Sequence, residues 1–166
     1  MPWSIHTSTP TKRNSLLWLK PGDFLAFVDQ VHSILYNHNN QKDLGSVDYK
    51  VVGHSAGGST IKRLGITGDL CKISPSMVVW SDSSYGTWLD HAWKGCLGKN
   101  PHIRVKVLVA KWDSPWRNAT RFLKTFKKKK PSNLSVHVFE RPMTHKLIGN
   151  NAVKLSNLLG ASDEAN

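Results

Sequence analysis

Short apolar runs rich in Val alternate along the chain with segments in which apolar residues recur at helical spacing. The apolar runs occupy residues 47–52, 73–80, 103–110 and 134–139. The segments with helical spacing occupy residues 59–64, 87–97, 116–129 and 152–159. Continuous Val-rich strands separated by amphipathic helices are typical of a parallel sheet that helices cover on both faces. The pattern therefore predicts an α/β fold with a mostly parallel central sheet flanked by helices.

The N-terminal part of the chain carries a weaker pattern. Residues 2–7 fit a short strand, and residues 23–36 fit a helix that begins at Asp23. Polar segments at 7–14 and 37–45 separate these elements from their neighbours. A length of 166 residues is that of one domain. We therefore expect a single domain at 1–160 and a frayed polar tail at 161–166.

The first Val-rich run leads into Gly53-His54-Ser55-Ala56-Gly57, which fits the pattern Gly-x-Ser-x-Gly. A strand before this pattern and a helix after it are the context of a nucleophile elbow, in which the serine stands in a strained turn at the end of the strand. Glycines flank the serine because a Cβ there would collide with the neighbouring strand or helix. The alternative is an ordinary glycine-rich turn between a strand and a helix.

Polar residues suited to hydrolytic catalysis follow all four predicted strands. Ser55 follows the first strand, Asp82 the second, Asp113 the third and His145 the fourth. The carboxyl ends of parallel strands meet at one edge of a sheet, so these side chains belong to the same edge. A nucleophilic serine needs a base to take its proton and an acid to orient that base. The order Ser, Asp, His therefore predicts a catalytic constellation.

The chain resembles the α/β-hydrolase family, in a compact form like the serine esterases and lipases, from about residue 23 to residue 159. The resemblance lies in the elbow, in the strand followed by Trp112-Asp113-Ser114-Pro115, and in the strand followed by Thr144-His145 and a last helix. It implies a carboxylic ester hydrolase that works through an acyl-enzyme intermediate, without a cofactor.

The same resemblance implies a role for each residue that matches the family motifs. Ser55 would be the nucleophile, His145 the base, Asp113 the orienting acid, and the Ala56 N–H a donor of the oxyanion hole. Asp82 is the alternative acid, because some relatives place the acid one strand earlier. The second oxyanion donor would lie within residues 7–15.

The chain departs from the family in its N-terminal half and in the absence of a lid. Only 46 residues precede Val47, so we expect a minimal hydrolase fold with a sheet trimmed to about five strands, or a front half supplied by another chain. The segment between Asp82 and Ile103 has room for one helix and no lid domain, which predicts an open site. The candidates for lining the substrate site are His54, Trp80, Tyr85, Trp112 and Trp116.

Two other interpretations of this constellation stay open. The first is a non-catalytic binding module on a hydrolase scaffold. The second is an amidase, thioesterase or acyltransferase that acts on a polymeric or anionic substrate, such as a cell-wall polymer. The histidines show no ligand spacing, so we expect no metal site.

The charge of the chain widens the range of partners. The formal net charge is +12 and the densest cationic run is Lys127, Lys128, Lys129 and Lys130, which favours an anionic surface or polymer. No motif for sequence-specific recognition of nucleic acid accompanies it. No apolar run approaches the roughly 20 residues of a membrane span. Residues 1–12 are polar, so we expect a cytoplasmic protein, or one released without a recognisable signal peptide.

The two cysteines, Cys71 and Cys96, do not form a disulfide framework or a zinc motif. We interpret them as two buried thiols, and a single disulfide between them is the open alternative.

Overall fold

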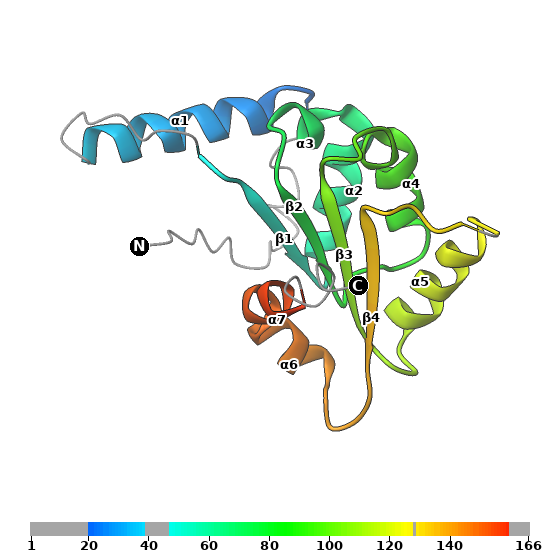
Figure 1. Ribbon diagram of the computed structural model, residues 1–166. Helices are drawn as coiled ribbons and strands as arrows, with labels where there is room; N and C mark the ends of the chain where they lie inside the picture. Colours follow the sequence, from blue (N-terminus) through cyan, green and yellow to red (C-terminus); the bar gives the residue numbers. More distant parts are fainter. Residues whose placement is uncertain (1–19, 39–46, 128, 160–166) are drawn as a thin grey trace.

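Four parallel strands form the centre of the computed structural model, which describes residues 20–38, 47–127 and 129–159 (Figure 1). The strands lie in the order β1 (Lys50–His54), β2 (Met77–Ser81), β3 (Arg104–Ala110) and β4 (Leu134–Phe139). Each strand pairs in parallel with the next one along the chain. The predicted parallel α/β architecture is therefore confirmed. The described sheet has four strands rather than five, and the strand expected at 2–7 lies outside the described residues.

Helices cover both faces of this sheet (Figure 1). One face carries the helices that connect the strands: α2 (Gly57–Thr67), α3 (Asp69–Lys72), α4 (Trp88–Gly95) and α5 (Ser114–Lys124). The other face carries α6 (His145–Asn150) and α7 (Ala152–Leu158). A short 3₁₀ turn, η2 (Leu97–Lys99), precedes β3. The chain thus crosses over the same face three times before it turns onto the second face after β4.

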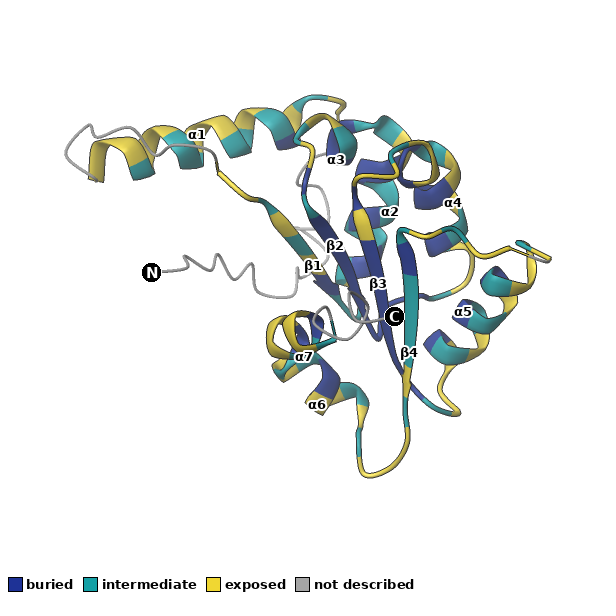
Figure 2. Ribbon diagram, in the orientation of Figure 1, coloured by how far each residue is buried: buried dark blue, intermediate teal, exposed yellow. Residues whose placement is uncertain are grey.

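Side chains of the central strands alternate between two cores, as the two-residue period of a strand requires. Val78 and Trp80 of β2 pack in the larger core with α2, α4 and α5. Met77 and Val79 of the same strand pack in the smaller core, where Ile148 of α6 is fully buried. Figure 2 shows that buried residues concentrate along β2 and β3. These two inner strands are therefore fixed from both sides, which holds their ends rigidly.

Helix α1 (Asp23–His38) packs on the body through Phe24, which is buried in the larger core, and polar contacts also hold it. The Gly22 N–H donates to the carboxylate of Asp69 over 2.7 Å. The Tyr49 hydroxyl is hydrogen-bonded to the ring of His32. Burial, followed by the negative charge of Asp29, raises the pKa of the Tyr49 phenol above its ordinary value.

Several boundaries differ from the sequence-based expectation for local reasons. Helix α5 begins earlier than residue 116 because Pro115 occupies its first turn, where a missing N–H has no cost. Gly68 ends α2 in the left-handed conformation, with φ of 80°, and α3 follows where we expected only a turn. Helix α6 was not expected, although Thr144 caps it by accepting a bond from the Leu147 N–H.

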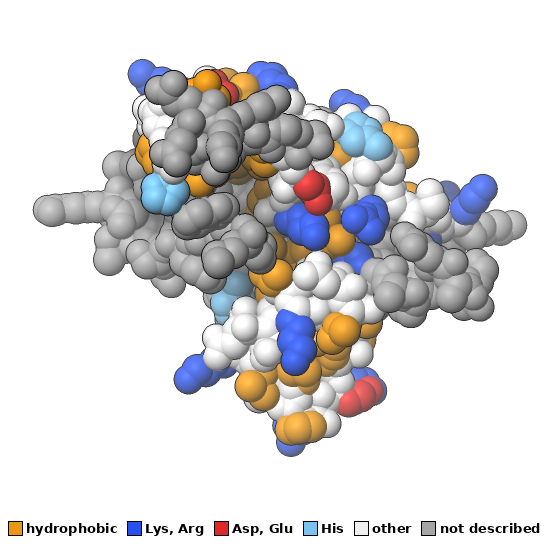
Figure 3. Space-filling model, turned by 60° about the vertical axis from the view of Figure 1, so that its left-hand side comes forward, with side chains coloured by type: hydrophobic (Ala, Val, Ile, Leu, Met, Phe, Trp, Pro, Cys, Tyr) orange, Lys and Arg blue, Asp and Glu red, His pale blue; other side chains and the backbone are white. Residues whose placement is uncertain are grey.

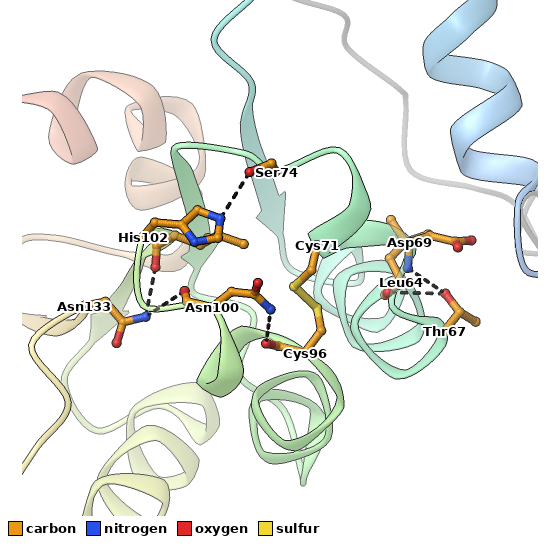
Figure 4. Close-up of a disulfide and its surroundings, with 10 residues drawn as sticks. Leu64, Thr67, Asp69, Cys71, Ser74, Cys96, Asn100, His102 and Asn133 are labelled. Carbon is orange, nitrogen blue, oxygen red and sulfur yellow. Dashed lines mark hydrogen bonds between the residues drawn. A yellow bond between two sulfur atoms is a disulfide. The ribbon is translucent and has the colours of Figure 1, made fainter.

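Cys71 and Cys96 form a disulfide, so the interpretation as two buried thiols is wrong (Figure 4). Their Cα atoms lie 6.1 Å apart, within the range that a disulfide bridges. The bond joins α3, before β2, to the end of α4, before β3. It therefore cross-links two connections at the amino ends of the strands.

We predict that reduction of this disulfide lowers the thermal midpoint of unfolding. The bond closes a loop with a sequence separation of 25 residues, which corresponds to a stabilisation of about 3 kcal/mol. For a chain of this length the midpoint should fall by roughly 10 °C. Differential scanning fluorimetry with and without a phosphine reductant measures the shift. The double variant Cys71→Ser/Cys96→Ser is the control, and a reductant effect of equal size in that variant would contradict the prediction.

Candidate functional site

Ser55 stands in a strained backbone conformation directly after β1. Its φ is 51°, in the left-handed region that residues other than glycine rarely adopt. The Ser55 N–H donates to the Ser81 carbonyl at the end of β2 over 3.3 Å. The Gly58 N–H in turn donates to the Ser55 carbonyl over 3.1 Å. The backbone on both sides of the serine is therefore held, which keeps its hydroxyl at the carboxyl edge of the sheet.

The glycines around Ser55 are needed for close packing, with one difference from the expectation. A Cβ on Gly53 would lie 2.5 Å from the Cδ1 of Ile61 in α2. A Cβ on Gly57, the second glycine of the motif, would meet nothing within 4 Å. It is Gly58 that is confined, since a Cβ there would lie 2.3 Å from the Ser83 carbonyl oxygen. Gly53 of the strand and Gly58 of the helix are thus the two positions at which neighbouring segments pack closely against the backbone.

The imidazole of His145 is bonded to the carboxylate of Asp82. His145 Nδ1 and Asp82 Oδ2 lie 2.7 Å apart. A carboxylate only accepts hydrogen bonds, so Nδ1 is the donor and Nε2 is left to accept a proton from another group. The Asp82 side chain is fully buried, whereas that of His145 is 38% exposed. The pair therefore has a fixed buried end and an accessible imidazole, the arrangement of a base oriented by an acid.

The preference for Asp113 as the partner of His145 is corrected by this geometry. Asp113 is exposed and lies at the N-cap of α5, and its carbonyl accepts the Arg117 N–H. Asp82 directly follows Ser81, the last residue of β2, and its Oδ1 also accepts the Ala110 N–H over 3.1 Å. The alternative acid is thus the one in contact with His145.

His54 packs against the same imidazole from the strand side. The ring centroids of His54 and His145 are 4.4 Å apart. His54 Nδ1 donates to the Ser81 carbonyl over 2.8 Å, the same oxygen that accepts the Ser55 N–H. A Cβ on Gly149 of α6 would collide with this ring, at 2.5 Å from its Nε2. His54 is therefore enclosed between β1 and α6, a position that the Gly-His-Ser motif alone does not reveal.

Two buried serines that sequence reasoning missed hold the connection after Asp82. Ser83 Oγ donates to the Gly53 carbonyl over 2.8 Å. Ser84 Oγ donates to the Pro115 carbonyl at the start of α5 over 2.9 Å. The only signal in the sequence was a serine-rich loop, which is common in unrelated turns. These bonds tie the ends of three neighbouring strands together.

The expected donor of the oxyanion hole, Ala56, is exposed at the entrance to α2. No hydrogen bond between described residues uses its N–H. A group that gains negative charge beside Ser55 can therefore receive this bond. The second donor, expected within residues 7–15, lies outside the described residues.

The candidates for lining the substrate site fall into different environments. Trp80 is fully buried in the larger core, so its assignment to a substrate site is wrong. Trp112 is 63% exposed, and its ring centroid lies 5.3 Å from that of the half-buried Trp116. Tyr85 is half-buried and makes an edge contact with Trp88. The aromatic surface of this edge therefore lies mainly on the connection after β3.

The described residues contain no group of three or more His, Cys, Asp or Glu side chains that could hold a metal ion. Within the same ranges, no helix is long and apolar enough to cross a membrane. Comparison with models of protein families, with curated proteins and with solved structures gives no match to this chain. The interpretation of the site therefore depends on its own geometry.

Proposed function

We propose that the chain is a serine hydrolase of the α/β-hydrolase type that cleaves carboxylic esters. The observation that carries the proposal is the bond between the buried Asp82 carboxylate and His145, next to the strand that ends in the strained Ser55. A buried carboxylate, an accessible imidazole and a serine on an elbow are the three parts of a hydrolytic triad. In this proposal Asp82 is the acid and Asp113 has no catalytic role.

The proposed reaction has two halves. His145 Nε2 takes the proton of the Ser55 hydroxyl while the Oγ attacks the ester carbonyl carbon, and the Ala56 N–H stabilises the oxyanion that forms. The tetrahedral intermediate collapses when the ester bond breaks, and the imidazolium gives its proton to the departing alcohol. A water molecule then repeats the attack on the acyl-enzyme with His145 as base, which releases the acid and restores Ser55. Asp82 remains ionised throughout.

The carboxyl edge favours a substrate with an exposed apolar or ring-shaped part. The connection after β2 leads directly into α4, so this described segment contains no lid domain. The exposed Trp112, in the connection that follows β3, offers a flat surface for an acyl chain or a sugar ring. Amides, thioesters and acyl transfer use the same machinery, and a panel of substrates separates them.

One observation favours a second candidate, a binding module that has kept the scaffold without catalysis. Between described residues, no hydrogen bond joins the Ser55 hydroxyl to His145. In resting enzymes such bonds are often long and shorten when substrate binds. A folded protein that neither hydrolyses p-nitrophenyl esters nor reacts with a fluorophosphonate would favour the binding module.

We predict that Ser55→Ala abolishes labelling by a fluorophosphonate and that Asp82→Asn lowers kcat for p-nitrophenyl acetate by roughly 10⁴-fold. Asparagine keeps the shape of the side chain but removes the charge that stabilises the imidazolium. Asp113→Asn is the matched control and should stay close to wild type, because Asp113 is exposed at a helix N-cap. Loss of activity in the Asp113 variant with retention in the Asp82 variant would reverse the assignment of the acid.

We further predict that His54 positions His145, and two variants separate its two contacts. His54→Phe keeps a ring against His145 but loses the bond to the Ser81 carbonyl, whereas His54→Asn keeps a donor and loses the ring. Each should lower kcat, by up to about 100-fold for a misplaced base, while KM changes little.

Ester kinetics and thermal midpoints of both His54 variants provide the measurement. A fall in the midpoint with unchanged kcat would assign His54 a purely structural role.

A further inference from the structure

Cations gather at the end of the sheet opposite the candidate site. We define the amino edge as the segments that lead into the four strands: residues 47–50, 72–76, 97–104 and 125–133. Among described residues these segments carry one acid, Asp48, and seven cations, namely Lys50, Lys72, Lys99, Arg104, Lys127, Lys129 and Lys130. This edge is therefore strongly positive.

The carboxyl edge of the same sheet is balanced in charge. Its connecting segments, residues 55–57, 82–87, 111–113 and 140–144, carry the acids Asp82, Asp113 and Glu140 and the cations Lys111 and Arg141. Lys111 and Glu140 form an ion pair with each other. The positive charge of the chain is thus not spread evenly over its surface, and the amino edge holds a large part of the excess.

The cations of the amino edge are available to a partner. All seven are exposed, and within the described part of the chain only Lys72 has an ion pair, with Asp69 at 3.2 Å. Figure 3 shows one face of the molecule, on which Lys and Arg side chains are more widespread than Asp and Glu. Cations that are not held in an ion pair remain available to attract an external anion.

The charges are close enough to act together. Lys50 and Arg104 both pair with Met77, so they project from the same face of the sheet on either side of β2. Two strand spacings amount to about 10 Å, which is close to the Debye length at physiological ionic strength, about 8 Å. The potentials of Lys50 and Arg104 therefore overlap in part.

The backbone that carries these cations is cross-linked, as Figure 4 shows. The disulfide joins Cys71 and Cys96, which directly precede the segments before β2 and β3. His102 Nε2 and Ser74 Oγ, 3.1 Å apart, form a second link between the same segments. Asn133 Nδ2, before β4, donates to the Ile103 carbonyl over 3.0 Å. A surface held in this way loses little conformational entropy when it binds.

We infer that the amino edge binds a linear polyanion with repeated phosphate groups. Cations placed in sequence across four strands fit a chain of anionic groups better than one small anion. Val47 is the one large apolar side chain exposed on the described part of this edge. Insertion into a membrane surface uses several exposed apolar or aromatic side chains, and unpaired bases are bound through exposed aromatic rings. The surface therefore reads backbone charge and not sequence.

The test compares two pairs of neutralised cations with a matched control pair. Lys129→Gln/Lys130→Gln changes the segment before β4, and Lys50→Gln/Arg104→Gln changes the starts of β1 and β3. The control, Arg117→Gln/Lys154→Gln, removes the same charge from exposed positions on α5 and α7. All variants carry Ser55→Ala, so the result does not depend on the proposed hydrolase activity.

Fluorescence anisotropy of labelled oligothymidylate at several salt concentrations gives the readout. Each contacting cation that is removed should lower the slope of log affinity against log salt by about 0.7. Both amino-edge pairs should show this change, and the control pair should keep the wild-type slope. Inorganic polyphosphate should compete for the surface, whereas monomeric phosphate at the same total phosphate concentration should not.

Two results would overturn the inference. The first is equal weakening by the control pair, which would mean that net charge alone attracts the polymer. The second is binding to vesicles of phosphatidylglycerol and phosphatidylcholine in preference to both polymers, which would assign the edge to a lipid surface. Thermal midpoints of all variants establish that each is folded.

Discussion

The buried carboxylate of Asp82 links three parts of the molecule that are distant in the sequence. It follows β2, accepts the Ala110 N–H at the end of β3, and binds His145 at the start of α6. An ionised carboxylate without partners in such a position would cost several kcal/mol, so the bond to His145 has a structural value before any catalytic one. The contact that would orient the base also helps to place α6 over the sheet, together with the burial of Ile148. The fold and the candidate site therefore depend on one interaction.

Three of the five described non-glycine residues with positive φ lie at the edge that carries this interaction, and the other two, Ser74 and Lys127, lie at the amino edge. Ser55, Asp82 and Trp112, which follow β1, β2 and β3, all have positive φ. Non-glycine residues in this region cost on the order of 1–3 kcal/mol each. The inner strands offset this cost, because side chains such as Val79 and Leu108 are fully buried. The strain turns three polar or aromatic side chains away from the direction of their strands and toward the edge.

The sequence predicted those parts of the structure that depend on local periodicity. Val-rich runs gave the four described strands, and the strand ends gave Ser55 and His145 at one edge. The preference for Asp113 over Asp82 as the partner of His145 was wrong, because both residues follow a strand and the period of a strand contains no information on which of the two lies closer to the imidazole. The order of the strands accounts for the contact of Asp82: β2 is the neighbour of β1, whereas Asp113 follows β3 and lies at the N-cap position of α5. The disulfide escaped prediction for the same reason, since the approach of Cys71 to Cys96 results from the packing of α2, α3 and α4.

A parallel sheet separates its two ends both chemically and electrostatically. The carboxyl ends of the strands, which carry the polar residues of the candidate site, lie at one edge of the sheet. The amino ends, which are rich in lysine, lie at the other edge. A strand of five residues such as β2 spans roughly 16 Å, about twice the Debye length in physiological salt. The cations of the amino edge are therefore largely screened from the opposite edge, while they still attract an external polymer. A polyanion held at one end would leave the other end open to solvent, so anchoring and chemistry can coexist on a chain of this size.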